Sequence, residues 1–227
     1  MLNDLWKYLQ NKYIWDLSRP ESIPNLFFNH ISIVGWSMLF ALIIAFPISL
    51  LITRHERLYL PVISIAGVLY SIPSVALLAV LVPTVGLNET TVIIALVAYA
   101  QIVLIRNFVA AIRAVDPALQ EVGRAMGMNE MQLLWRVTLP LALPVIIAGL
   151  RVATVTSIGI ATIAPVVSVP DLGSLIFEGF EPFYPPEILT GALLSTLLAV
   201  SADLGLLGLQ RALSRGRTVA VAQQGGM

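Results

Sequence analysis

A polar insert, residues 113–140, lies between the long apolar runs of this 227-residue chain and reads RAVDPALQEVGRAMGMNEMQLLWRVTLP. Its first half predicts a short helix. Asp116 can cap the free amide groups of that helix, and Pro117 fits the first helical position. Gly127 can adopt the left-handed backbone conformation that ends a helix.

The second half of the insert predicts another short helix. Asn129 can cap it while Gln132, three residues later, reaches back to the cap. Pro140 is expected to end it, because proline disrupts a helix interior. Neither helix is long enough to be stable alone in water, so both need a surface to pack on. This surface is either a groove of a cytoplasmic protein or the surface of the lipid bilayer, and the residues alone do not distinguish the two.

The composition indicates lipid as the solvent for most of the chain. Hydrophobic residues make up 58% and charged residues 11%, whereas soluble domains carry about 25% charged residues. No cysteine is present, which excludes disulfides, thiol catalysis and cysteine-bound metals. Two histidines are too few for a typical zinc site, and a net charge of zero gives no argument for nucleic acid.

Five apolar runs are expected to cross the roughly 30 Å of membrane hydrocarbon. They cover residues 31–53, 58–82, 90–105, 143–167 and 188–210, and the third reaches residue 112 if Arg106 extends its charge toward water. The expected fold is therefore an all-α integral membrane bundle of five transmembrane helices with the insert as a cytoplasmic loop.

The positions of lysine and arginine predict the orientation. Short loops rich in Lys and Arg tend to remain in the cytoplasm. Such residues follow the first, third and fifth runs, whereas the loops after the second and fourth runs have none. The N-terminus is therefore expected outside and the C-terminus in the cytoplasm. Lys7, Lys12 and Arg19 count against this orientation.

Two segments flank the expected membrane domain at 30–212. Residues 1–29 mix charges with two Trp and two Tyr, which suits a helix at the outer headgroup boundary; a loosely ordered tail is the alternative. Residues 213–227 are expected to form a cytoplasmic tail.

Arg151 and Asp203 interrupt the last two apolar runs, each about 10 Å from the cytoplasmic end at 1.5 Å per residue. Charges inside membranes usually face the bundle interior and pair. We therefore expect the two to pair directly or through water. In the alternative, Arg151 reaches back to the cytoplasm and Asp203 bonds within its own helix.

Small polar residues in the second and fourth runs are candidates for a translocation path. Segment 70–74 is the main candidate for a bend that lines it, and helix-packing contacts are the alternative use of such residues. The candidates are Tyr70, Ser71, Pro73, Ser74, Thr154 and Ser157.

The insert resembles the coupling signature of binding-protein-dependent ABC importer permeases. That signature is Glu-Ala-Ala-x3-Gly-x9-Ile-x-Leu-Pro, and the chain has Glu121-Val122-Gly123, Gly127 and Val137-x-Leu139-Pro140 at the same intervals. Both alanines and the isoleucine are replaced. The chain resembles in particular the permeases for quaternary ammonium compatible solutes (glycine betaine, carnitine, choline), in stretches at 71–77, 123–128, 139–144 and 148–151. The similarity covers residues 30–212.

The resemblance implies a multi-subunit importer in the bacterial inner membrane. In the family, the loop docks into a cleft of a cytoplasmic ATPase. The chain has no Walker A motif, since neither of its lysines follows a glycine, so ATP and Mg²⁺ are expected on the ATPase subunits. No catalysis, cofactor or metal is expected in this chain. A second permease chain, identical or related, and a separate external binding protein are the other implied partners. The implied coupling residues are Glu121, Val122, Gly123, Gly127, Met128, Leu139 and Pro140.

The outer loop, residues 168–187, carries four carboxylates and four aromatic rings. Aromatic faces can bind quaternary ammonium groups, although an aromatic girdle at the membrane boundary is the alternative. In the family, the start of this loop usually reads Gly-Ala-Gly-Gly-Leu-Gly and forms part of the outer gate. Here it reads Ser-Val-Pro-Asp-Leu-Gly. Because this stretch departs from the family's pattern, the details of the family's gate do not carry over to it.

The expected function is ATP-driven import of a betaine-type osmoprotectant under osmotic stress. Import of an amino acid or another small organic solute is the alternative within the class. An ion-coupled secondary transporter should show inverted repeats or buried acids near the midplane, and no clear repeat is evident. A membrane scaffold would not need an insert with fixed intervals.

Overall fold

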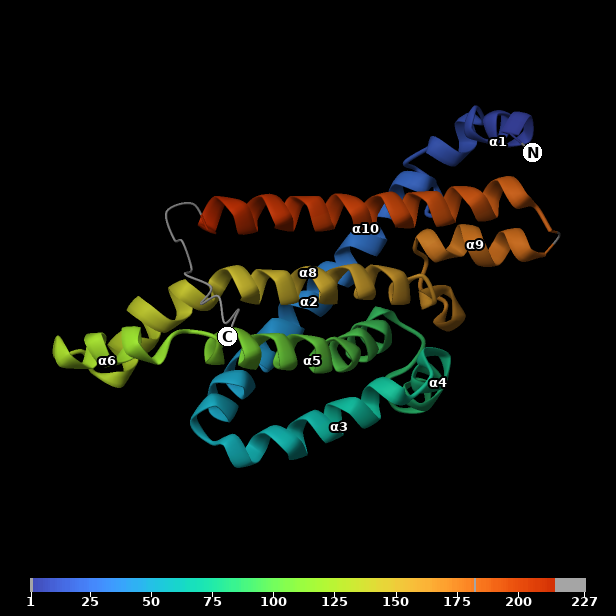
Figure 1. Ribbon diagram of the computed structural model, residues 1–227. Helices are drawn as coiled ribbons and strands as arrows, with labels where there is room; N and C mark the ends of the chain where they lie inside the picture. The colour runs from blue at the N-terminus through green and yellow to red at the C-terminus, as the bar shows by residue number, and fades with distance from the viewer. Residues whose placement is uncertain (1, 182, 215–227) are drawn as a thin grey trace, which may run out of the picture.

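Four long apolar helices dominate the structure, a computed structural model in which residues 2–181 and 183–214 are described. They are α2 (Ile23–Arg54), α5 (Glu89–Arg113), a helix from Glu130 to Ala161 and α10 (Pro185–Ser214). Each is long and apolar enough to cross a membrane. Figure 1 shows α5, α8 and α10 running side by side, with α2 crossing them obliquely. The described part contains no strand, so the expected all-α membrane fold is confirmed.

The centre of the bundle is α5, which packs against α2 and α8. In the most apolar window of α5, 61% of the residues are buried inside the protein, compared with 6% for α10. Leu104, Ile105 and Phe108 of α5 are almost completely buried. In contrast, α10 lies at the edge, along α8 and α9 (Leu172–Phe180). An apolar helix with so little protein cover needs lipid or another chain around it.

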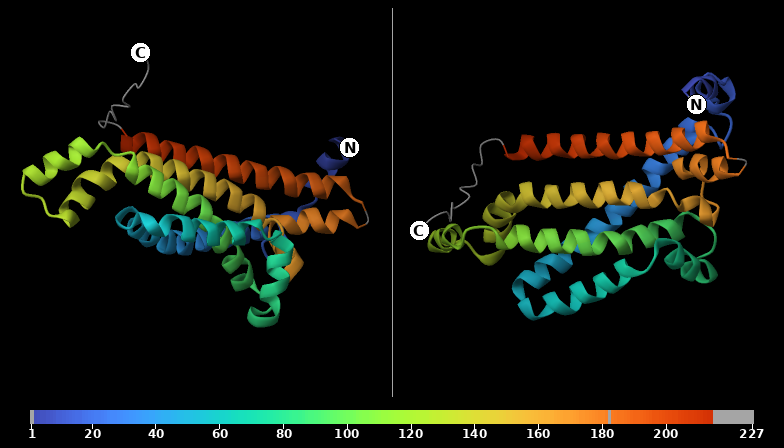
Figure 2. Two further views of the ribbon diagram at one scale, coloured as in Figure 1. Left: turned by 60° about the horizontal axis from the view of Figure 1, so that its bottom comes forward. Right: turned by 45° about the vertical axis from the view of Figure 1, so that its right-hand side comes forward.

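The second apolar run is broken rather than continuous. After the 3₁₀ turn η2 (Glu56–Leu58) it forms α3 (Tyr59–Ser71) and α4 (Ser74–Val85), which are bent by 94° relative to each other. Figure 2 shows α4 turning away from the line of α3. Pro73 causes the break, because a residue before proline is driven out of helical conformation, and Ile72 has an extended ψ of 128°. The bundle thus has four spans, or five if this pair counts as one.

The polar insert forms a hairpin of two helices, α6 (Pro117–Ala125) and α7 (Glu130–Leu133). Asp116 caps α6 by accepting a hydrogen bond from the amide of Ala118. Gly127 has a φ of +82°, the left-handed conformation expected there. Asn129 and Gln132 form the predicted capping box. Figure 1 shows the hairpin protruding from one end of the bundle.

Pro140 does not end the second helix, contrary to our expectation. A π turn (η3, Leu134–Thr138) joins α7 to α8 (Leu139–Ala161), so the helix is continuous from Glu130 to Ala161. In the π turn the amide of Leu139 bonds to the carbonyl of Leu134, five residues back. Pro140 lies in the first turn after this shift, where its missing N–H is tolerated. The fourth span therefore starts earlier than residue 143, and it ends at Ala161 before a 3₁₀ turn, η4 (Ala164–Val167).

The N-terminal segment is an ordered part of the end of the bundle opposite the hairpin. It forms α1 (Leu2–Leu9) and the 3₁₀ turn η1 (Lys12–Trp15), and α2 begins at Ile23, earlier than the expected residue 31. Tyr8 packs edge-on against Tyr184, with ring centroids 5.7 Å apart. Its hydroxyl donates a hydrogen bond of 3.3 Å to Glu187 of α10. These contacts favour an ordered segment over a loose tail. Most of the expected C-terminal tail, residues 215–227, lies outside the described residues.

Candidate functional site

The tip of the hairpin is a compact turn closed by backbone hydrogen bonds. The amide of Gly127 bonds to the carbonyl of Arg124 at 2.9 Å, and the amide of Met128 bonds to the carbonyl of Gly123 at 3.1 Å. Arg124 also holds Glu130 with two hydrogen bonds of 2.9 and 3.4 Å. This contact with Glu130 raises the pKa of the Arg124 guanidinium, so the pair stays charged. The turn fixes the angle between α6 and α7.

Gly123 is the point of closest approach between the two hairpin helices. It is buried, and a Cβ atom added there would lie 2.7 Å from Cδ1 of Leu133. Leu133 is itself buried. A larger residue at this position would push the helices apart, so the local geometry explains a small side chain at position 123.

The hairpin presents an exposed apolar surface. Val122 of α6 is 57% exposed, Met126 directly after α6 is 72% exposed, and Trp135 of η3 is 56% exposed. Glu121 lies beside them and is also exposed. Exposed apolar side chains on a protruding element are typical of a docking surface.

The seven expected coupling residues fall into two groups. Five lie in the hairpin tip: Glu121 and Val122 are exposed, Gly123 is buried, Gly127 forms the turn and Met128 is half-buried. Leu139 and Pro140 lie at the root of the hairpin, where η3 joins α8. The continuous helix from Glu130 to Ala161 contains the second group, whereas the first group lies on α6 and in the turn before it.

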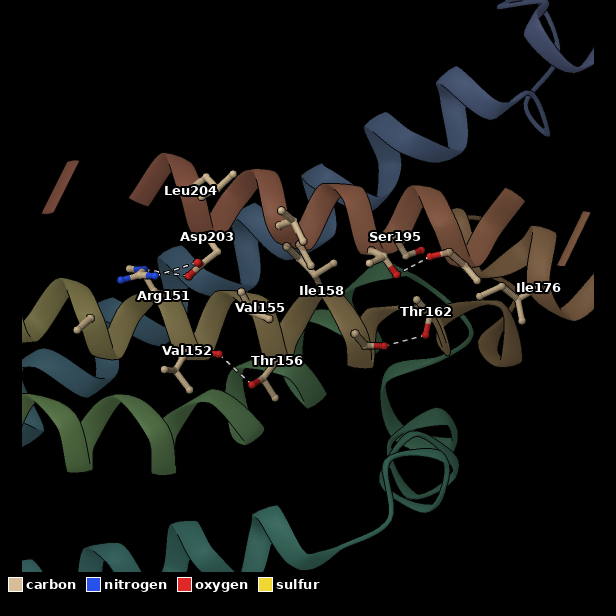
Figure 3. Close-up of a pocket in the computed structure, with 16 residues that line it drawn as sticks. Arg151, Val152, Val155, Thr156, Ile158, Thr162, Ile176, Ser195, Asp203 and Leu204 are labelled. Carbon is tan, nitrogen blue, oxygen red and sulfur yellow. Dashed lines mark hydrogen bonds and ion pairs between the residues drawn. The ribbon is translucent and has the colours of Figure 1, made fainter. Parts of the chain in front are cut away.

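Arg151 and Asp203 form a two-pronged ion pair between α8 and α10. Nε and Nη2 of Arg151 donate to the two carboxylate oxygens at 2.9 and 2.8 Å (Figure 3). The side chains are 22% and 34% exposed, so the pair is partly screened. Nη1 of Arg151 also donates to Oε1 of Gln210 at 3.1 Å. Sequence analysis missed Gln210, although it follows Asp203 by seven residues and so lies on the same helix face.

The ion pair lies in a groove of about 960 Å³ between α8, α9 and α10 (Figure 3). Most of the groove is apolar. Four hydroxyl residues line it, and each donates a hydrogen bond to a carbonyl of its own helix or turn: Thr156, Thr162, Ser195 and Thr196. These hydroxyls are therefore satisfied locally, and the ion pair is the main polar feature of the groove.

The six expected path residues do not lie on one surface of this chain. Tyr70, Ser71, Pro73 and Ser74 lie at the α3–α4 break, and the first three are exposed. The break is braced by Tyr99, whose hydroxyl donates to the carbonyl of Ile72 at 2.8 Å.

The other two expected path residues lie on α8. Thr154 lines a separate pocket of about 580 Å³ between α2, α8 and α10. Ser157 is buried, and its hydroxyl lies 3.5 Å from the sulfur of Met38 on α2. Ser157 is therefore a packing contact between helices in this structure, whereas the α3–α4 break is open to the surroundings.

The end of the bundle opposite the hairpin contains an unexpected buried pair. Nδ1 of His30 in α2 lies 2.9 Å from Oδ2 of Asp171, and both side chains are 0% exposed. The other carboxylate oxygen of Asp171 caps α9 by accepting from the amide of Gly173 at 2.7 Å. Burial raises the pKa of the Asp171 carboxyl, and the hydrogen bond from His30 opposes this shift. No local sequence signal connects these two distant positions.

The aromatic rings of loop 168–187 do not form a cage in the described residues. Phe177, Phe180 and Phe183 are exposed, and Tyr184 contacts the ring of Tyr8. This arrangement is typical of rings at a membrane boundary.

The apolar bundle and protruding hairpin define a multi-span membrane protein that offers a docking element to a partner. The family described as "Binding-protein-dependent transport system inner membrane component" matches residues 44–219, and the chain belongs to this family. It is thus a multi-pass inner membrane protein and a non-catalytic permease subunit of an ABC transporter, as the resemblance implied.

Characterised relatives cover most of the chain. The glycine betaine/carnitine/choline transport system permease protein OpuCD of Bacillus subtilis is 42% identical over 189 residues, which are 83% of this chain and 82% of the relative. The osmoprotectant import permease protein OsmW of Salmonella typhimurium is 35% identical and covers 82% of this chain and 89% of its own length.

Solved structures support the fold. The inward-facing MetNI methionine ABC transporter has a chain with a TM-score of 0.74 at 23% identity, covering 82% of this chain and 93% of that chain. An amino acid ABC transporter described with histidines has a TM-score of 0.72 at 16% identity, covering 92% and 98%. At such identities the likeness shows a shared fold alone.

Proposed function

We propose that this chain is the permease of an ATP-driven importer for quaternary ammonium compatible solutes of the glycine betaine, carnitine and choline type. The observation that carries this proposal is the 42% identity to a permease of that description over 83% of the chain. The amino acid transporters among the structural neighbours share the fold at 23% identity or less, which gives no argument for an amino acid substrate.

The hairpin is the proposed contact with the ATPase. Its end of the bundle would face the cytoplasm, with the loop 113–140 as coupling loop and residues 1–29 outside. The exposed Val122 and Met126 would enter a groove of the ATPase, and Glu121 would add a polar contact. ATP and Mg²⁺ would be bound by the ATPase subunits, and movement there would reach the spans through the continuous helix that starts at Glu130.

The remaining partners follow from the exposed surfaces and the family. A second permease chain, identical or related, would pair with this one around the path, and an external binding protein would deliver the solute. Within the membrane domain at 30–212, the α3–α4 break from Tyr70 to Ser74 is the best-exposed part of the proposed path. Transport would proceed by alternating access, since partners that bind inward- and outward-open states differently shift their populations.

Reconstitution tests the proposal. The chain is placed in liposomes with its ATPase and binding protein, and uptake of radiolabelled glycine betaine, carnitine and choline is measured with and without ATP. We expect ATP-dependent uptake of at least one of them, and no uptake when the Walker A lysine of the ATPase is replaced. Uptake of an amino acid alone would reject the substrate class, and uptake driven by an ion gradient without the ATPase would reject the mechanism.

A further inference from the structure

A second polar cleft lies behind the hairpin, separate from the groove of the Arg151–Asp203 pair. It has a volume of about 360 Å³ and lies where the ends of α2 and α5 meet the hairpin. The turn between α2 and α3 lies at this same end of the bundle (Figures 1 and 2). One water occupies about 30 Å³ in the liquid, so the cleft has room for a small hydrated group.

Three arginines from three elements line this cleft. Arg54 is the last residue of α2, Arg113 is the last residue of α5, and Arg124 belongs to α6. Glu130 is the single carboxylate among the lining residues. The cleft therefore carries a local excess of positive charge, although the chain as a whole has a formal net charge of zero.

The three guanidinium groups differ in how they are satisfied. Arg124 is held by Glu130, and Arg113 contacts Glu56 at 3.3 Å and lies over the ring of Tyr59. The Arg54 guanidinium makes no hydrogen bond or ion pair within the described part of the chain, although its charge also acts on Glu130. A planar guanidinium with free donors suits the oxygens of a phosphate, which it can bind with two parallel hydrogen bonds.

The walls of the cleft indicate where its ligand comes from. Because Arg54 and Arg113 end two membrane spans, the cleft lies at the level of the lipid headgroups. Its other lining includes the apolar side chains of Leu50, Ile112 and Leu134. Anionic headgroups attract basic residues at this level. A phosphate group with acyl chains could thus meet both the arginines and the apolar wall.

We propose that this cleft binds a phosphate group, either the headgroup of an anionic lipid or free phosphate, between Arg54, Arg113 and Arg124. The ligand would link two membrane spans to the coupling hairpin. Binding can be measured without transport, so this inference does not rest on the proposed substrate or on the ATPase.

The test uses the purified full-length chain in detergent. Native mass spectrometry measures the binding of phosphatidylglycerol and of phosphatidylcholine with identical acyl chains, and thermal unfolding is followed with inorganic phosphate or chloride at equal ionic strength. We compare Arg54→Gln and, as a second variant on another helix, Arg113→Gln. Arg211→Gln is the matched control, because it removes the same charge at the same end of the bundle but outside the cleft.

The site binds a lipid headgroup if the parent prefers phosphatidylglycerol and this preference is about tenfold weaker in both cleft variants. The preference should be kept in Arg211→Gln. A phosphate-dependent rise of the unfolding midpoint with the same variant pattern assigns the site to free phosphate. The inference is overturned if neither ligand is preferred, or if the control loses as much binding as the cleft variants, which indicates non-specific attraction to surface charge.

Discussion

At the scale of single residues, the Arg151–Asp203 pair makes the sharpest prediction. Asp203→Arg would place two positive charges together and remove the acceptor of two Arg151 hydrogen bonds, so we expect uptake to be lost and stability to fall. Adding Arg151→Asp restores opposite charges and should recover part of both. Uptake in liposomes and thermal unfolding measure the two effects.

The control for this pair is Thr156→Val in the same groove. Its hydroxyl bonds to the carbonyl of Val152 in its own helix, so its loss should change uptake little. If Asp203→Arg combined with Arg151→Asp shows no more uptake or stability than Asp203→Arg alone, the pairing itself is not what matters.

The buried His30–Asp171 pair predicts a larger loss of stability. His30→Leu removes one partner and leaves Oδ2 of Asp171 without its polar neighbour in a site with 0% exposure. Leaving a buried polar group without a partner costs about 1–3 kcal/mol, and more for a charged group. Asp171→Asn added to His30→Leu removes the charge but keeps an oxygen that can cap α9, so it should recover part of the loss. Thermal unfolding of the parent, the single variant and the double variant checks this order of stability. A double variant with a lower unfolding midpoint than His30→Leu would contradict it.

At the scale of helices and turns, Gly127 makes an equally direct prediction. An alanine there must adopt a φ of +82°, which costs about 1–2 kcal/mol. We expect Gly127→Ala to distort the hairpin tip and reduce the stimulation of ATPase activity by the loaded binding protein. Binding of the solute to the binding protein should not change.

Gly208→Ala on α10 is the matched control for Gly127→Ala. Gly208 lies within a helix, and no described atom lies within 4 Å of an added Cβ. Alanine is the better helix former by about 1 kcal/mol, so this variant should be as stable as the parent or more stable. Equal loss of ATPase stimulation in both variants would show that the turn conformation is not the cause.

The outer corner formed by α1, α9 and α10 predicts a pH dependence. Burial first, and then the charges of Glu187 and Glu21, raise the pKa of Glu178. A raised pKa means that the folded state prefers the protonated form, so the charged form weakens the corner at neutral pH and the penalty fades as the pH falls. Glu178→Gln should raise the unfolding midpoint at pH of about 7.5 and much less at about 5. An equal rise at both pH values would contradict this cause.

The elements that the sequence predicted correctly are those with local signals. Asp116 and Asn129 cap helices, and Gly127 forms the turn, because each acts on residues only two to four positions away. The end predicted at Pro140 was wrong, because the π turn before it shifts the hydrogen-bond pattern and lets the helix continue. At Pro73, in contrast, the predicted bend is present, and it divides the second apolar run into α3 and α4.

At the scale of the whole molecule, the composition and the apolar runs were enough to predict a membrane bundle, and the fixed intervals of the insert were enough to indicate the family. Contacts between distant segments could not be derived in this way, except for the pair of intramembrane charges, Arg151 and Asp203. The pairing of His30 with Asp171 depends on how α9 folds back onto α2, and Ser157 faces Met38 only because α8 packs there. Such contacts follow from the tertiary arrangement and have no periodic signature.

The unbroken helix from Glu130 to Ala161 has a mechanical consequence. Its 32 residues extend over about 48 Å at 1.5 Å per residue. A helix of that length acts as a lever that packs along α5. A small stroke at the hairpin must reappear as a tilt of the far end, next to η4 and the buried Asp171. The π turn and Pro144 are then the places along the lever where the stroke can be absorbed before it reaches the far end.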